Sequence, residues 1–131
     1  MSYALSIDLT QPFDEVVPLV REALAANGFG IVAEIDMQQT LKSKIGAEIE
    51  PYLILGACNP RFAQRALQVE PSVGLLLPCN VVVRRTGEVT VVEAINPETL
   101  VTLTENRAMA ALAPELTAAL NAALDRLRDT A

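Results

Sequence analysis

Two valine-rich stretches joined by a very short turn constrain the fold of this chain more than any other feature. They are GLLLPCNVVVRR (74–85) and EVTVVEAI (88–95), with Thr86 and Gly87 between them. Apolar, β-branched stretches on either side of a two-residue turn containing glycine are typical of a β-hairpin, whose strands are antiparallel. A sheet that contains this hairpin is at least partly antiparallel, which excludes an all-parallel, doubly wound architecture.

The turn also predicts which residues of the hairpin face each other. If Thr86 and Gly87 form the loop, then Asn80 lies opposite Glu93, and Cys79 lies at the same end of the pair of strands. Glu93 is then flanked by apolar residues, and an enclosed carboxyl group of this kind is a candidate for acid–base chemistry. The alternative is that Glu93 points to solvent from an exposed face of the sheet.

The remaining apolar patterns predict three further strands and a series of helices. Alternating or continuous apolar runs predict strands over 2–10, 29–37 and 51–58. Helical spacing and capping residues predict helices over 11–28, 38–46, 60–70 and from 97 onward, the last of them restarting at Pro114.

This order of elements predicts one domain over residues 1–131 with an α+β fold. We expect a two-layer sandwich, in which the first and last helices pack on one face of a mostly antiparallel sheet of four or five strands. The ends of two helices can also be predicted. Asp36, with Gln39 three residues later, resembles a capping box, and Asn59 is expected to cap a helix that begins at Pro60.

The charge and composition indicate which partners to expect. The net charge is −6 and no segment concentrates basic residues, which argues against nucleic acid and against anionic membranes. No apolar run is long enough to cross a bilayer, and two cysteines without a signal peptide predict a cytoplasmic protein. A hydrophobic content of 51% and a final helix rich in leucine and alanine predict a homodimer that covers spare apolar surface.

The absence of histidine removes several classes of site. It excludes His-based general bases, Ser-His-Asp and Cys-His arrangements, and His-ligated metals. Two cysteines about twenty residues apart are not a zinc clamp, and only a soft two-coordinate ion such as Cu(I) would accept two thiolates. No glycine-rich phosphate loop is present. We therefore assign no metal, no cofactor and no catalytic residue from the sequence.

Each cysteine precedes an asparagine at the edge of an apolar run, in ILGACNP (54–60) and LLLPCNVVV (75–83). The cysteines can share a site only if their strands are antiparallel neighbours, which the hairpin favours. The alternatives are that the cysteines are small core residues, that the first asparagine is only a helix cap, and that a lysine nearby belongs to a solvated helix face. The candidate ligand-binding residues are Cys58, Asn59, Cys79, Asn80, Glu93 and, if its helix flanks the cysteine end of the sheet, Lys42.

Two long segments give the chain a family resemblance. EIDMQQTLKSKIGAEIEPYLILGACNP (34–60) and ALQVEPSVGLLLPCNVVVRRTGEVTVVEAINP (66–97) resemble the bacterial and archaeal family called domain of unknown function 302. The resemblance covers nearly the whole chain. It implies a fold similar to the TATA-box-binding-protein-like arrangement, β-α-β(4)-α, in proteins often seen as dimers. It implies no established activity, and a fold shared with a DNA-binding protein does not carry DNA binding with it.

Three classes of function remain open from the sequence. The first is a cytoplasmic domain that binds a small molecule or an ion, with an accessory role in redox or sulfur metabolism. The second is an enzyme with Cys58 or Cys79 as its nucleophile and Glu93 as the acid–base partner. The third is a structural or interaction protein that forms a homodimer and has no small ligand.

Overall fold

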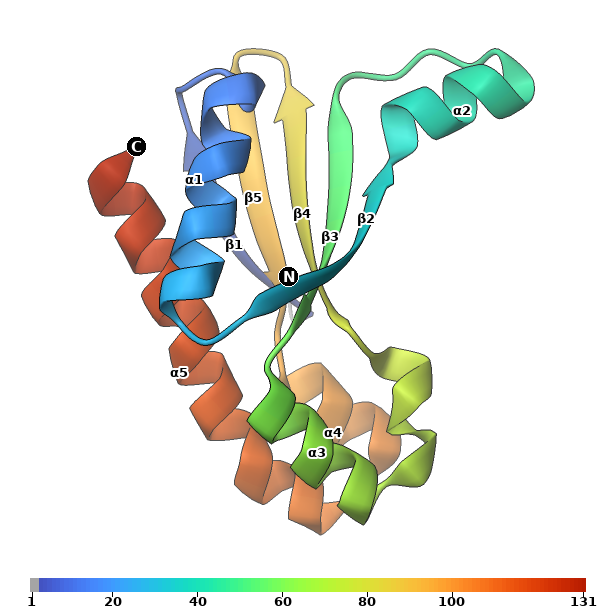
Figure 1. Ribbon diagram of the computed structural model, residues 1–131, viewed down its shortest axis with the longest axis vertical. Coiled ribbons are helices and arrows are strands. Elements are labelled where there is room, and N and C mark those ends of the chain that lie inside the picture. Colours follow the sequence, from blue (N-terminus) through green and yellow to red (C-terminus); the bar gives the residue numbers. More distant parts are fainter. Residues whose placement is uncertain (1–2) are drawn as a thin grey trace.

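The computed structural model describes residues 3–131 of the chain (Figure 1). These residues form five strands, five α-helices and one 3₁₀ segment, which is labelled η1. In chain order they are β1 (Ala4–Leu9), α1 (Phe13–Ala26), β2 (Gly30–Asp36), α2 (Met37–Ile45), β3 (Tyr52–Cys58), α3 (Pro60–Val69), η1 (Pro71–Leu76), β4 (Cys79–Thr86), β5 (Val89–Ile95), α4 (Glu98–Thr104) and α5 (Arg107–Thr130).

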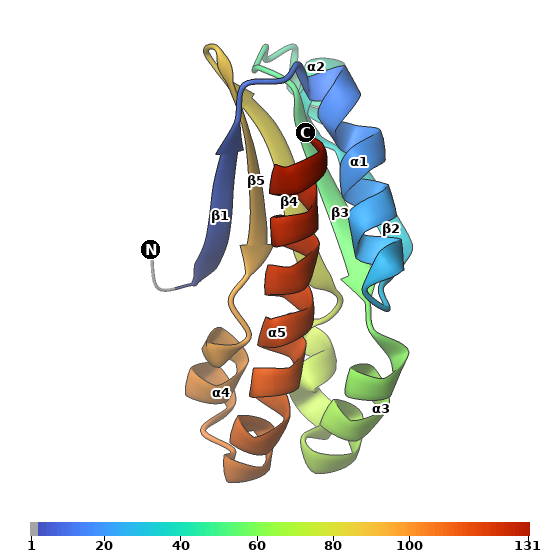
Figure 2. The same cartoon turned by 90° about the vertical axis from the view of Figure 1, so that its left-hand side faces the viewer.

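The strands form one sheet in which every neighbouring pair is antiparallel. Its order is β1-β5-β4-β3-β2, so the β4–β5 hairpin lies near the centre and β1 and β2 are the edges. Helices α1 and α5 pack side by side on one face of the sheet (Figure 2). Within residues 3–131, no helix covers the other face, which we call the outer face. The predicted α+β two-layer sandwich, with the first and last helices on one face, is confirmed.

The core lies between the sheet and these two helices. In the central strands, alternate residues such as Val81, Val83 and Val92 point toward the helices and are less than 2% exposed. Leu116 and Leu120 of α5 meet them and are equally buried. These side chains lie four residues apart on one stripe of the helix, which explains why so long a helix lies flat along the sheet.

The core strands and helices match the arrangement that the resemblance implied. Without α2, α3, η1 and α4, the order is one strand, one helix, four strands and a final helix. The additional segments lie at the two ends of the sheet. In Figure 1, α2 projects from one end, and α3, η1 and α4 gather beyond the other end with the first turns of α5.

The predicted register of the hairpin is wrong by two residues. The loop is Gly87-Glu88 because Thr86 still pairs with Val89. Gly87 has a φ of 60°, a conformation that the first loop residue of a type II′ turn requires and that glycine adopts without strain. Glu93 therefore lies opposite Val82 and not opposite Asn80.

Two further predictions of local structure are wrong. The strand expected from residue 74 begins only at Cys79, because residues 71–76 form η1 and the Leu77-Pro78 peptide bond is cis. The last helix does not restart at Pro114, which lies inside α5. The break comes earlier, at Glu105 and Asn106, where Glu105 has a φ of 52° and the Asn106 side chain caps α5.

Candidate functional site

The two cysteines lie at the same end of the sheet, on neighbouring antiparallel strands. Cys58 is the last residue of β3 and Cys79 is the first residue of β4. Cys79 is directly opposite Ala57, the residue before Cys58. The expectation that the two cysteine strands are antiparallel neighbours is therefore confirmed, and both cysteines are free thiols.

Both cysteines line one hollow, which we call the thiol hollow. It has a volume of about 330 Å³, and almost all of its surface is apolar. Its walls come from the end of β3, from α3, from the segment that leads into β4, and from the edge strand β2. The lining residues are Val32, Ala57, Cys58, Asn59, Phe62, Ala63, Leu67, Gly74, Leu77, Pro78 and Cys79.

Burial determines the chemistry of Cys79. Its side chain is 3% exposed, and this burial, together with a smaller effect of the nearby Cys58, raises its pKa from 9.0 to about 11. A thiolate would be poorly solvated there, so the Cys79 thiol is protonated at neutral pH. Cys58 is only half-buried and is the more accessible of the two thiols.

Asn59 has a structural role as well as a place in the wall. Its side-chain oxygen accepts a hydrogen bond of 3.2 Å from the Phe62 N–H, and Pro60 follows as the first helical residue of α3. This is the predicted helix cap. Because the cap uses the side-chain oxygen, Asn59 offers the hollow little hydrogen-bonding capacity beyond its amide nitrogen.

Glu93 and Asn80 are not part of the thiol hollow. Both belong to strand positions that alternate with the core residues, so they lie on the outer face, and Asn80 is exposed. Arg84 Nε donates a hydrogen bond of 2.8 Å to Glu93 Oε1. This bond raises the pKa of Arg84, so the predicted acid–base group is one half of an ion pair on the sheet surface.

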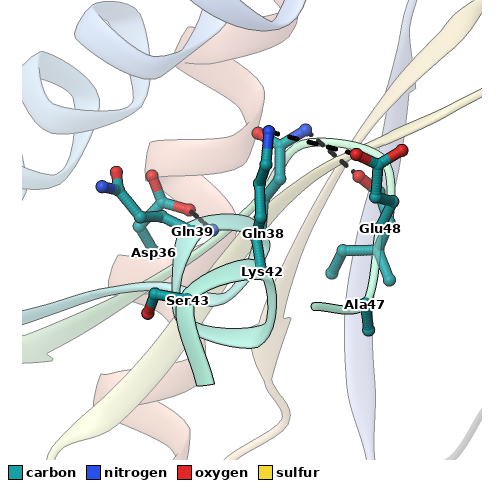
Figure 3. A pocket seen from close by; sticks show the side chains of 8 residues that line it. Asp36, Gln38, Gln39, Lys42, Ser43, Ala47 and Glu48 are labelled. Carbon is teal, nitrogen blue, oxygen red and sulfur yellow. Dashed lines mark hydrogen bonds and ion pairs between the residues drawn. The ribbon is translucent and has the colours of Figure 1, made fainter. Parts of the chain in front are cut away.

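Lys42 lies at the opposite end of the sheet from both cysteines. It belongs to α2, which begins next to the pair formed by Asp36 and Leu53, whereas Cys58 pairs with Gly30 at the other end. Lys42 faces Glu48 at 4.0 Å across a separate, open pocket of about 600 Å³ (Figure 3).

The pocket beside α2 is lined by polar groups, and the sequence did not predict this pocket. Gln38 donates to the Ile49 carbonyl at 3.1 Å, and Asp36 accepts from the Gln39 N–H at 2.9 Å (Figure 3). The first bond ties α2 to its return loop, and the second caps the helix. The Gln38 amide and the Asp36 carboxylate therefore already have hydrogen-bond partners within the chain. The capping box around Asp36 and the candidate residue Lys42 were the two signals of this region in the sequence.

Several residues of the thiol hollow were also missed. Val32, Phe62, Leu67 and Pro78 come from three separate segments of the chain and read as ordinary core residues in the sequence. For Pro78, the only indication in the sequence of a place in the site was its position next to Cys79. Within residues 3–131, no three Cys, Asp or Glu side chains lie close enough together to hold a metal ion. In the same range, no helix is long and apolar enough to span a membrane.

Comparisons with known proteins agree with this fold. The model of the family described as domain of unknown function DUF302 matches residues 5–127. The crystal structure of the uncharacterized conserved protein DUF302 from Bacillus stearothermophilus superposes with a TM-score of 0.89 at 28% identity, covering 97% of this chain and 99% of that one. A search of curated proteins finds no match. The family model spans nearly the whole sandwich, from β1 into the last turn of α5, and the chain belongs to the DUF302 family.

Proposed function

We propose that this protein binds a small, mainly apolar molecule in the thiol hollow. One observation carries the proposal: an apolar hollow of about 330 Å³ is lined by both cysteines of the chain. Ligand sites are typically concave, largely apolar and of roughly 300–1,000 Å³. A protein gains nothing in stability from an apolar hollow that it leaves unfilled, so a ligand is a physical reason for the hollow to exist.

The lining narrows the class of ligand. The polar side chains among the lining residues are the two thiols and Asn59, so an ionic or strongly hydrogen-bonding ligand would lose its hydration with little replacement. Thiols are soft, polarisable groups. The favoured ligand is therefore a neutral molecule with aromatic, alkyl or sulfur-containing parts.

An accessory role in redox or sulfur metabolism is a second candidate. It is favoured by the proximity of the thiols, which is close enough for Cys58 to raise the pKa of Cys79. Two thiols in one hollow offer a soft ion such as Cu(I) two sulfur ligands, with one proton released from each. Free thiols also fit a reducing compartment, which supports a cytoplasmic location.

A cysteine-nucleophile enzyme is less well supported. Cys79 is held in its protonated form, and Glu93 lies outside the thiol hollow, paired with Arg84. Cys58 would have to act without the acid–base partner that the sequence offered. A purely structural or interaction protein, the third class, would have no use for the thiol hollow.

Binding of benzene and indole, followed by NMR, tests the main proposal. Both probes should shift the amide signals of α3 and of the strand ends that carry Cys58 and Cys79. Ala63→Leu places a larger side chain in the hollow and should abolish these shifts. Ala118→Leu, on an exposed position of α5, is the matched control and should leave them unchanged.

Cu(I) titration followed by native mass spectrometry tests the second candidate. One ion should bind per chain, and the double variant Cys58→Ala/Cys79→Ala should lose it. If neither apolar probe shifts the amides around the hollow, the main proposal is wrong. If Cu(I) stays bound in the double variant, the thiols are not its ligands and the second candidate is wrong.

A further inference from the structure

The edge strand β2 contributes no buried residue to the core. No residue in the stretch 30–51, which comprises β2, α2 and the loop that returns to β3, is buried. Several of its side chains are nevertheless large and apolar: Ile45 is 73% exposed, Val32 64% and Ile35 46%. Every other strand of the sheet buries at least two side chains in the core.

Helix α2 lacks the packing that a helix of its length needs. It has nine residues, and isolated helices shorter than about 12–15 residues are marginal in water. The Asp36 cap and Gly46, which ends the helix with a φ of 67°, stabilise its two ends only. Its main contacts are with β2 and β3, and Figure 1 shows it projecting away from the rest of the molecule. We call α2 and its return loop, residues 37–51, the α2 arm.

The thiol hollow opens at the other end of this same edge. Val32 of β2 and Leu67 of α3 belong to its wall and are 64% and 45% exposed, so the hollow has an apolar mouth. In Figure 1, the α2 arm projects beyond β2 at one end of the sheet, and η1 and α3 lie at the other end. One edge thus carries a protruding arm with the exposed Ile45 on it and an apolar hollow, with the edge strand β2 between them.

We propose that a second copy of this chain covers this edge, with the α2 arm of each copy packed against the mouth of the other copy's thiol hollow. A two-fold axis through the middle of β2 places the second copy with its β2 antiparallel to the first. Because arm and hollow lie at opposite ends of β2, each arm then meets the hollow of the partner. Such an interface is isologous, uses the same patch twice and closes without leaving a free arm. It supplies α2 with the packing that its own chain does not give.

The size of the exposed stretch agrees with a stable dimer. A standard interface engages roughly 20–30 residues on each side, and the accessible residues of 30–51 together with the mouth of the hollow are numerous enough to supply one. The patch also includes the backbone groups on the free side of β2, which no strand in the described residues 3–131 pairs. Covering an exposed sheet edge removes a site of uncontrolled strand pairing.

The packing has a consequence for the ligand site, and this part rests on the proposed function. The arm of the second copy closes the mouth of the thiol hollow, so each site is complete only in the dimer. The same contact brings Lys42 of one copy to the end of the sheet that carries the cysteines of the other. Within one chain, these residues lie at opposite ends.

Sedimentation velocity at micromolar concentration tests the surface directly. The wild type should be a dimer. Ile45→Asp in the arm and Leu67→Asp at the mouth should each raise the dissociation constant of the dimer about 100-fold or more, because each would bury an unpaired carboxylate. Tyr3→Asp, at an exposed apolar residue beside the opposite edge strand, is the control and should remain a dimer. A monomeric wild type, or a dimer that survives both variants, overturns the proposal.

A mixing experiment tests that arm and hollow are reciprocal partners. In a heterodimer of one Ile45→Asp chain and one Leu67→Asp chain, both substitutions fall in the same arm–hollow contact. The other contact has the wild-type arm and the wild-type hollow. An equimolar mixture should therefore recover part of the dimer that each variant alone has lost. If the variants are dimers alone or fail to combine when mixed, the arm does not meet the hollow.

A cross-link gives a second and independent measurement. In a Cys79→Ala background, Ile45→Cys should form a covalent dimer when diamide accepts the two electrons and two protons that disulfide formation releases. Cys58→Ala added to this variant should prevent the cross-link, and a cross-link that persists would show that the arms meet each other instead of the hollow. A dimer that behaves as expected but binds neither benzene nor indole would leave the docking surface intact and refute only the proposed ligand site.

Discussion

The ring of Pro78 lies directly over Gly56 on the neighbouring strand. A Cβ atom built on Gly56 would approach Pro78 Cγ to 2.7 Å and Ala33 Cβ to 3.1 Å. The first distance is too short for any side chain, so β3 needs a glycine at the point where the cis Leu77-Pro78 bond leads the chain into β4. This contact fixes one wall of the thiol hollow, because Pro78 lines it.

Gly56→Ala should destabilise the protein by about 1–3 kcal/mol, the usual cost of overpacking, measured as the free energy of unfolding in urea. The new methyl group must displace Pro78 or push β3 away from its neighbours. Gly30→Ala is the matched control, because Gly30 is also a strand residue but a Cβ atom there meets nothing within 4 Å. Equal stability of the two variants would mean that Pro78 does not pack on Gly56.

The sequence predicted the elements and the faces of the sheet but not the contacts between strands. The hairpin register was wrong by two residues. Because side chains alternate with a period of two, Glu93 still lies on the same face as Asn80, but its side chain meets Arg84 instead. A glycine within the turn favours a two-residue loop without showing which loop position the glycine occupies. Local patterns of this kind do not determine a cross-strand neighbour.

The cysteine site could be predicted only in part, for a similar reason. The antiparallel approach of Cys58 and Cys79 follows from the topology, which the hairpin constrains. The remaining wall, including Phe62 and Leu67, comes from the way α3 packs beyond the end of the sheet. Lys42 was assigned conditionally because the direction in which α2 projects depends on tertiary packing, which helical periodicity does not encode.

Asn59→Ala should destabilise the protein by about 1 kcal/mol, since it removes the side-chain oxygen that accepts from the Phe62 N–H. Asn59→Ser should retain most of the stability because serine caps a helix equally well. Thermal unfolding of the three proteins gives the comparison. If both variants bind indole as the wild type does, Asn59 acts as a cap alone; a loss of stability in the serine variant equal to that in the alanine variant would contradict the capping role.

Cys58 should react with iodoacetamide much faster than Cys79 at pH 8. Cys58 is half-buried, whereas Cys79 is 3% exposed and burial favours its protonated, unreactive form. Mass spectrometry of a time course should show one modified thiol per chain well before the second. The single variants Cys58→Ala and Cys79→Ala assign the fast and slow phases, and a fast phase that survives Cys58→Ala would contradict this ordering.

The Arg84–Glu93 pair should contribute no more than about 1 kcal/mol to stability. Both side chains are partly open to solvent, at 31% and 19% exposure, which weakens an ion pair even at 2.8 Å. A double-mutant cycle with Arg84→Ala and Glu93→Ala measures this coupling from four urea titrations. A coupling of several kcal/mol would contradict a solvated pair and point to a more enclosed outer face.

The stability of the protein should fall between pH 9 and pH 11 because of Cys79. In the unfolded chain the thiol loses its proton near its ordinary pKa of 9.0, whereas in the folded protein burial keeps it protonated up to about pH 11. The unfolded state therefore binds fewer protons in this window, and raising the pH favours unfolding. A shift of two pH units corresponds to roughly 3 kcal/mol at 1.36 kcal/mol per unit.

The test is the difference in free energy of unfolding between the wild type and Cys79→Ala, because contributions that the two proteins share cancel in this difference. Their free energies of unfolding should differ by a constant amount below pH 9, where the thiol is protonated in both states of the wild type. Above pH 9 the wild type should lose more stability than the variant, and the gap should narrow or reverse by pH 11. Parallel curves across the whole range would mean that the Cys79 thiol is solvated and that the hollow is open to water.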